Sequence, residues 1–171
     1  GAMGGLAAKW LAREEARVLG VFGAGWQARS QIEAACAVRP IELVKVFSRT
    51  REKLDAFCRE MSQLVERTVV AAKTAEELVR GSDIVVTITT SSTPLFSADW
   101  LEDGTHITAA GSNSLIRREI DEATVRRAAR IVVDARQTAL REAGDLLPLL
   151  EKGRLHDGQL VEIGEVMVGS R

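Results

Sequence analysis

A short apolar run at residues 18–22 ends in a glycine-rich turn, and a helical pattern follows at once. The turn has the spacing Gly-x-Gly-x-x-Ala, with Gly23, Gly25 and Ala28 at the three small positions. The first glycine lets the chain turn off a strand, the second lets a pyrophosphate approach the backbone amides, and the alanine lets the helix lie close to the sheet. A dinucleotide-binding turn is one interpretation of this stretch, and a purely structural strand-to-helix turn is the other.

Strand patterns alternate with helix patterns along the chain. The predicted strands are runs rich in β-branched residues at residues 17–22, 43–48, 68–72, 83–88, 105–110 and 130–134. Helical patterns lie at residues 6–16, 24–38, 50–61, 75–80, 121–129, 137–143, 146–152 and 161–168. This alternation predicts an α/β fold, a doubly wound parallel sheet of the Rossmann type with about six strands and helices on both faces.

Several helix ends carry recognisable signals. Thr50 and Asp121 are expected to be N-caps, because their side chains can accept a hydrogen bond from a free backbone amide. Thr74 and Glu77 have the spacing of a capping box, and Gly81 is expected to end that helix in the left-handed conformation.

Polar loops follow four of the predicted strands, at residues 23–25, 48–51, 89–93 and 110–114. Each is rich in Gly, Ser, Thr or Asn. In a doubly wound sheet, ligands bind outside the carboxyl ends of the strands, near the point where the strand order reverses. The four loops meet at that edge, which favours the dinucleotide interpretation of the glycine turn.

The end of the second strand indicates which dinucleotide is bound. An acidic residue about 20 residues past the glycine turn would hold the ribose hydroxyls of NAD. Ser48, Arg49, Thr50 and Arg51 stand there instead. Hydroxyl and guanidinium groups suit a 2′-phosphate, so NADP is favoured over NAD. The alternative is that both arginines are solvated residues of an ordinary loop.

Bulk properties exclude several classes of protein. The 23 basic and 24 acidic residues nearly cancel, which argues against a nucleic-acid partner. No apolar run is long enough to cross a membrane and no signal peptide is evident, so we expect a cytoplasmic protein. Cys36 and Cys58 are expected to be reduced core residues, and His106 and His156 lack the spacing of metal ligands. Residues 1–3 look like a cloning remnant, and residues 4–171 are expected to form a single domain.

Four longer stretches are more specific than the glycine turn: LGVFGAGWQARSQIEAACAVRPIELVKVFSRT, GSDIVVTITTSSTPLF, GTHITAAGSNS and RIVVDARQTALREAGDL. In these the chain resembles the ornithine cyclodeaminase/mu-crystallin family, which also holds alanine dehydrogenases and ketimine reductases. The resemblance runs from about Leu6 to Gly169. It implies a cofactor domain excised from a two-domain enzyme that acts on a small amino or imino acid. The substrate domain, which forms the family's homodimer, would lie in segments outside this chain.

The resemblance also assigns cofactor contacts. Gly23, Ala24, Gly25 and Gln27 match the pyrophosphate turn, to which Trp26 would contribute its backbone amide. Ser48, Arg49 and Thr50 match the adenosine-ribose loop, and Thr89, Thr90 and Ser91 match the loop at the ribose and nicotinamide. Ala110, Gly111, Ser112 and Asn113 follow the fifth strand, where the nicotinamide would meet the substrate.

Asn113 stands where ornithine cyclodeaminases carry an aspartate that acts as general acid and base. An amide cannot exchange a proton at neutral pH, so cyclodeamination would lack its expected base. An NADP-dependent hydride transfer on a small amino or imino acid is therefore favoured as the parent activity, with its other catalytic groups outside this chain. An NAD-dependent ornithine cyclodeaminase, a lyase, and a non-catalytic cofactor- or ligand-binding module are the alternatives.

Overall fold

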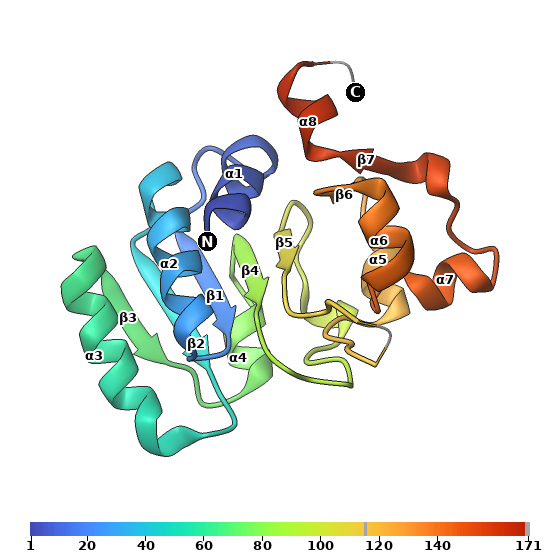
Figure 1. Ribbon diagram of the computed structural model, residues 1–171. Coiled ribbons are helices and arrows are strands. Elements are labelled where there is room, and N and C mark those ends of the chain that lie inside the picture. Colours follow the sequence, from blue (N-terminus) through green and yellow to red (C-terminus); the bar gives the residue numbers. More distant parts are fainter. Residues whose placement is uncertain (115, 170–171) are drawn as a thin grey trace. The chain divides into compact units, whose positions relative to one another are not determined.

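The computed structural model describes residues 1–114 and 116–169 (Figure 1). The chain forms two compact units, and a single domain over residues 4–171 stays a prediction. The first contains residues Gly1–Thr89 and Asp99–Ala110, and the second contains Thr90–Ala98 and Gly111–Arg171. Each unit is described by itself.

The first unit is built on a parallel five-stranded sheet with the strand order β3-β2-β1-β4-β5. Its strands are β1 (Val18–Phe22), β2 (Leu43–Phe47), β3 (Thr68–Ala71), β4 (Ile84–Thr87) and β5 (His106–Ala109). Its helices are α1 (Ala2–Leu11), α2 (Trp26–Val38), α3 (Leu54–Val65) and α4 (Ala75–Val79). The strand order reverses between β1 and β4, which is the arrangement expected of a doubly wound sheet.

Helices cover both faces of this sheet, as predicted. Alternate residues of β1 point to opposite faces. Leu19 and Val21 are fully buried in a core shared with Ile32 of α2. On the other face, a Cβ added to Gly20 would lie 2.6 Å from the side chain of Leu78, so a larger residue at this position would clash with α4.

The sixth predicted strand lies outside this sheet. It is β6 (Ile131–Val133), which pairs in parallel with β7 (Leu160–Glu162) as a two-stranded sheet of the second unit. The sequence predicted a helix over 161–168, but only α8 (Ile163–Met167) is helical there. The apolar spacing of this stretch is compatible with a helix and with a strand. Its start forms a strand because its backbone pairs with β6.

The second unit also contains α5 (Glu122–Arg127), α6 (Arg136–Glu142) and α7 (Leu147–Glu151). Its buried apolar residues include Val125, Leu149, Leu155 and Leu160. Short 3₁₀ turns occur along the chain at Arg51–Lys53, Ala98–Trp100 and Asp157–Gln159. Within the described ranges, no helix is long and apolar enough to cross a membrane.

The cap predictions have mixed outcomes. Asp121 accepts the amide of Thr124 at 2.7 Å, and Gly81 has φ +66°, both as predicted. Thr74 accepts the amide of Glu77 at 3.1 Å, but the carboxylate of Glu77 returns to the amide of Lys73 rather than to Thr74. The prediction for Thr50 is wrong: its side chain caps nothing, because a 3₁₀ turn intervenes and α3 begins only at Leu54.

The first helix differs from the prediction at both ends. It was expected over residues 6–16, but α1 begins at Ala2, inside the segment set aside as a cloning remnant, and ends at Leu11 because Ala12 is extended. The guanidinium of Arg39 stabilises this end, since it donates to the carbonyls of Lys9 and Ala12 at 2.6 and 2.9 Å.

Candidate functional site

The glycine turn joins β1 to α2 at the carboxyl edge of the sheet. Gly23 has φ +114°, and a Cβ there would lie 2.6 Å from the carbonyl oxygen of Ile88, so only glycine fits. Its amide donates to the carbonyl of Phe47 at 2.9 Å, and the amide of Ile88 donates to Phe22 at 3.0 Å. The turn is thereby fixed against the ends of both neighbouring strands, β2 and β4.

The start of α2 is open. Gly25 is its N-cap, no side chain caps it, and its first turn holds no acidic residue. A Cβ added to Gly25 would meet nothing within 4 Å. Ala28 is 1% exposed, which brings the helix close to the sheet. Amides and the positive end of a helix dipole therefore face free space, an arrangement that favours an anion such as a pyrophosphate.

Trp26 and Gln27 occupy the first turn of α2, next to Ala24 of the glycine turn. The Trp26 side chain is 85% exposed, and Gln27 is exposed as well. Both were predicted as contacts of the cofactor, Trp26 through its backbone amide. Neither side chain is needed for the packing of α2, which leaves both available to a ligand or to a further segment of protein.

The loop after β2 presents cations at the same edge. Ser48 is half-buried and its Oγ accepts the amide of Thr50 at 3.3 Å. Arg49 and Thr50 are exposed. The Arg49 guanidinium has no hydrogen bond or ion pair with any residue that the structure describes. The guanidinium of Arg51, in contrast, donates to the backbone carbonyl of Lys73.

Thr89, which follows β4, also lies in the first unit, and it is half-buried. Just before it, Thr87 is fully buried, and within the described ranges its hydroxyl has no hydrogen-bond partner. The predicted contacts Gly23, Ala24, Gly25, Trp26, Gln27, Ser48, Arg49, Thr50 and Thr89 therefore all belong to loops or a helix start of one unit.

The other predicted contacts, Thr90, Ser91, Gly111, Ser112 and Asn113, belong to the second unit. The carbonyl of Thr90 accepts the guanidinium of Arg117. Ser91 is buried, and its carbonyl accepts the amide of Arg118 at 3.1 Å. Asn113 is exposed. The segments at residues 90–91 and 117–118 are thus held together within this unit.

Two buried carboxyl groups, which the sequence reasoning missed, fix the loop that carries Asn113. Glu119 is fully buried and accepts the amide of Gly111 at 2.7 Å. Asp145 accepts the amides of Glu119 and Ile120 at 2.7 and 3.1 Å, and its own amide donates to the hydroxyl of Ser112 at 3.1 Å. Nothing in a single sequence distinguishes these acids from solvated ones, since Glu119 follows two arginines and Asp145 follows a glycine.

Burial raises the pKa of Asp145, and the neighbouring charge of Glu119 raises it further, while the two backbone amides oppose the shift. The carboxyl pair is therefore an electrostatically costly feature that is compensated by amide donors. The pair contacts Gly111 and Ser112, at the start of the loop that carries Asn113.

His106, Cys36 and Cys58 lie within the packed part of the first unit. His106 starts β5, its Nε2 lies 3.1 Å from the hydroxyl of Thr108, and burial together with the charge of Arg39 lowers its pKa to about 4. Cys36 and Cys58 are free thiols of the first unit's core, as predicted. The described ranges hold no group of three or more His, Cys, Asp or Glu residues placed to bind a metal.

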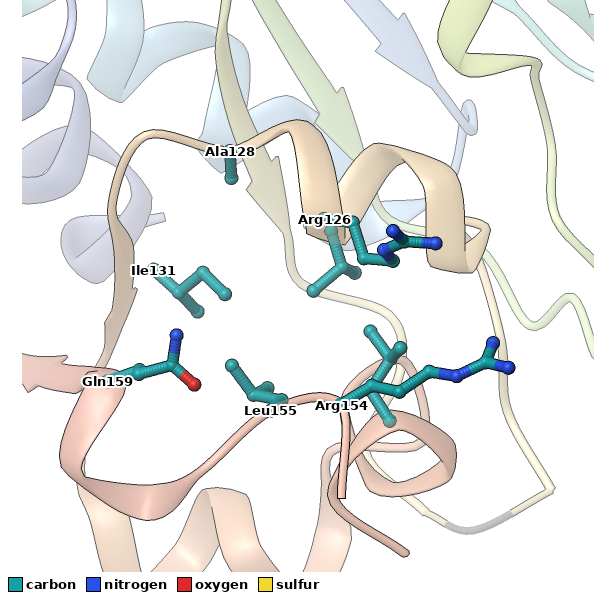
Figure 2. Close-up of a pocket in the computed structure, with 8 residues that line it drawn as sticks. Arg126, Ala128, Ile131, Arg154, Leu155 and Gln159 are labelled. Atoms are coloured by element: carbon teal, nitrogen blue, oxygen red, sulfur yellow. The ribbon is translucent and has the colours of Figure 1, made fainter. Parts of the chain in front are cut away.

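A hollow of about 170 Å³ in the second unit is separate from the predicted contacts (Figure 2). Its lining includes the apolar side chains of Leu149 and Leu155. Figure 2 shows the guanidinium groups of Arg126 and Arg154 on one side and Gln159 on the other. The Arg154 group lies 3.4 Å from the carboxylate of Glu122. None of the predicted cofactor contacts lines this hollow.

Comparison with known proteins decides the family. The family model described as the ornithine cyclodeaminase/mu-crystallin family matches residues 1–171. The chain belongs to this family. The resemblance predicted from the sequence is thereby confirmed.

Relatives within this family are similar over the whole chain. A Delta(1)-pyrroline-2-carboxylate reductase of Bacillus cereus is 36% identical over 172 residues, which cover 100% of this chain and 53% of that protein. The structure of the Thermococcus litoralis Delta(1)-pyrroline-2-carboxylate reductase in complex with NADH and L-proline matches with a TM-score of 0.94 and 34% identity, covering 99% of this chain and 52% of that one.

A dimeric archaeal alanine dehydrogenase with bound NAD matches with a TM-score of 0.85 and 33% identity, covering 99% of this chain and 52% of that one. This chain spans about half the length of the curated relatives and solved structures that it matches.

Proposed function

We propose that this chain is the NADP-binding part of an oxidoreductase that transfers hydride to or from a small amino or imino acid. The open start of α2 at Gly25 carries the proposal, because among the described residues no side chain caps the backbone amides that it offers to a pyrophosphate at the switch point of the sheet. The family and the names of its relatives support the same oxidoreductase function. Two relatives are named as reductases of a cyclic imino acid, and a third as an alanine dehydrogenase.

The residues of the first unit fit a dinucleotide. A side chain at Gly25 would enter the space that the pyrophosphate needs, and Gly23 cannot carry a side chain at all. We assign the pyrophosphate to the turn Gly23–Gln27 and the adenosine ribose to Ser48, Arg49 and Thr50. When bound, the nicotinamide supplies or accepts the hydride. The chain's own part is to bind the dinucleotide and hold it in one orientation.

Arg49 supports NADP over NAD. Its guanidinium is exposed and unpaired among the described residues, and no acidic residue stands at Ser48 to hold a ribose 2′-hydroxyl. NAD is the second candidate, because the two solved relatives contain NADH or NAD. Calorimetric titrations of the chain and of its Arg49→Ala variant with NADPH and with NADH distinguish the two candidate cofactors. Each charge-assisted contact contributes roughly 1.5–3 kcal/mol, so NADPH affinity should fall at least tenfold and NADH affinity should stay the same. Equal losses would favour NAD.

For the nicotinamide end we propose Thr89, Thr90, Ser91, Gly111, Ser112 and Asn113. The amide of Asn113 can donate and accept hydrogen bonds but cannot take up a proton at neutral pH. It can therefore position a polar substrate group, whereas a proton must come from another residue. This chemistry fits hydride transfer better than cyclodeamination. An Asn113→Asp variant should leave NADPH affinity unchanged within about twofold if the side chain serves the substrate rather than the cofactor.

Substrate recognition and assembly are proposed for the whole protein. The relatives' names indicate a small amino or imino acid, and one relative is a dimer. We propose that the parent enzyme is a homodimer and that its substrate-binding groups other than Asn113 lie outside residues 1–171. The isolated chain should then bind NADPH without turning over an amino or imino acid. Measurable reduction of pyruvate with ammonia by this chain alone would contradict that arrangement.

A further inference from the structure

We infer that Lys73 is a second cation of the subsite for the adenosine 2′-phosphate and that Arg51 fixes its backbone there. This inference rests on the proposed function, because it adds a specificity-determining residue to the same cofactor site. The sequence pattern indicated contacts to the 2′-phosphate only in the loop after β2. Lys73 belongs to a different loop, the one after β3.

The register of the sheet brings the two loops together. β2 and β3 pair in parallel, with Val46 opposite Ala71. The pairing extends one residue further, since the amide of Ala72 donates to the carbonyl of Val46 at 2.8 Å. Continuing both strands past that pair places Lys73 beside Ser48. Both residues therefore leave the same edge of the sheet, where Arg49 also lies.

The backbone of Lys73 is held on both sides. Its amide donates to the carboxylate of Glu77 at 2.8 Å, and its carbonyl accepts the guanidinium of Arg51. Arg51 therefore ties the loop after β2 to the loop after β3. The ammonium group of Lys73 takes no part in this arrangement. It is exposed, and it has no hydrogen bond or ion pair within the part of the chain that the structure describes.

The chemistry of a phosphate monoester calls for more than one cation. The group carries up to two negative charges and several acceptor oxygens, which a guanidinium fork and an ammonium point charge can share. Arg49 supplies the guanidinium from the loop after β2, and Lys73 supplies the ammonium from the loop after β3. A ribose with a free 2′-hydroxyl offers no anion at this place. Lys73 should therefore act on the affinity for NADPH and not on the affinity for NADH.

The test compares ligands that differ only in the 2′-phosphate. Adenosine 2′,5′-bisphosphate and adenosine 5′-monophosphate are one pair, and NADPH and NADH are the other, each titrated calorimetrically into the chain. Lys73→Met removes the charge and keeps the apolar stem. We expect about tenfold weaker binding of the bisphosphate and of NADPH, with the monophosphate and NADH changed by less than about twofold. Lys73→Arg should retain most of the affinity.

Lys9→Met is the matched control. Lys9 is exposed in α1, and its carbonyl accepts Arg39 just past the end of α2. Because α2 starts at the carboxyl edge, its end lies at the opposite edge of the sheet. This variant should bind all four ligands as the unsubstituted chain does.

The outcomes separate the two claims. Suppose that the unsubstituted chain binds NADPH. If Lys73→Met then binds all four nucleotides as Lys9→Met does, or if its affinity falls equally for both nucleotides of a pair, the role of Lys73 is refuted and the proposed function stands. If the unsubstituted chain binds none of the four nucleotides, the proposed function fails, and the role of Lys73 fails with it.

Discussion

The carboxylate of Glu119 accepts the backbone amide of Gly111 at 2.7 Å although the Glu119 side chain is fully buried. A buried carboxylate is costly unless donors compensate it. Here the donor belongs to the loop that carries Asn113. The bond therefore couples the stability of the second unit to the geometry of a loop that we assign to the nicotinamide end of the cofactor.

Removing this acceptor should destabilise the protein. In Glu119→Ala, the amide of Gly111 loses its partner and a cavity forms, so the free energy of unfolding should fall by roughly 2–4 kcal/mol. Chemical denaturation monitored by circular dichroism measures this. Glu151→Ala is the control, because Glu151 is exposed. The free energy of unfolding of this variant should lie within about 0.5 kcal/mol of that of the unsubstituted chain. Similar small changes in both variants would contradict the proposed coupling.

A second prediction separates folding from binding at the glycine turn. A side chain at Gly25 meets no atom within 4 Å, and its backbone is extended. Gly25→Val should therefore keep the unfolding temperature within a few degrees, because loss of a glycine N-cap costs only about 1 kcal/mol. The same variant should lose NADPH binding, since the added atoms occupy the space assigned to the pyrophosphate.

Gly158→Ala is the control for this experiment. Gly158 is also exposed and open, but it belongs to the second unit, whereas Gly25 belongs to the first. Its variant should keep both stability and NADPH affinity. If Gly25→Val binds NADPH as well as Gly158→Ala does, the turn is structural and not a cofactor site.

The stability of the first unit should depend on the charge of His106. Burial lowers its pKa to about 4, below the value of about 6.5 for an unfolded chain. Because the pKa is lower in the folded state, neutral His106 contributes to the free energy of unfolding. This contribution is present above about pH 6.5 and is lost as the pH falls toward 4. The full contribution is roughly 3 kcal/mol.

Denaturation curves measured between pH 7 and pH 4 test this, with His106→Gln as the variant and His156→Gln as the exposed control. His106→Gln should show a smaller loss of stability over that range than the unsubstituted chain, and His156→Gln should not. An NMR titration that places the pKa of His106 near 6.5 would contradict the prediction.

Much of the first unit could be predicted from the sequence because local signals and the fold agree there. Glycines mark the turn at Gly23 and Gly25, β-branched runs mark β4, and four polar loops follow the strand ends. Each of these signals is local, and the parallel topology follows from their alternation.

The rest depends on contacts between residues far apart in the sequence. The pairing of β6 with β7 joins residues 131 and 160, and the backbone amide of Glu119 donates to the carboxyl group of Asp145, 26 residues later. The tie between Arg51 and Lys73 depends on the register of two neighbouring strands. Thr50 shows the same limit at short range, since a three-residue 3₁₀ turn lies between it and the start of α3.

The most direct test of the account is a calorimetric titration of the unsubstituted chain with NADPH and with NADH at neutral pH. The open start of α2 and the cations of Arg49 and Lys73, which have no partner among the described residues, predict saturable one-to-one binding of NADPH, at least about tenfold tighter than that of NADH. Absence of binding for both nucleotides would contradict the cofactor site, and equal affinity for the two would contradict its assignment to NADP.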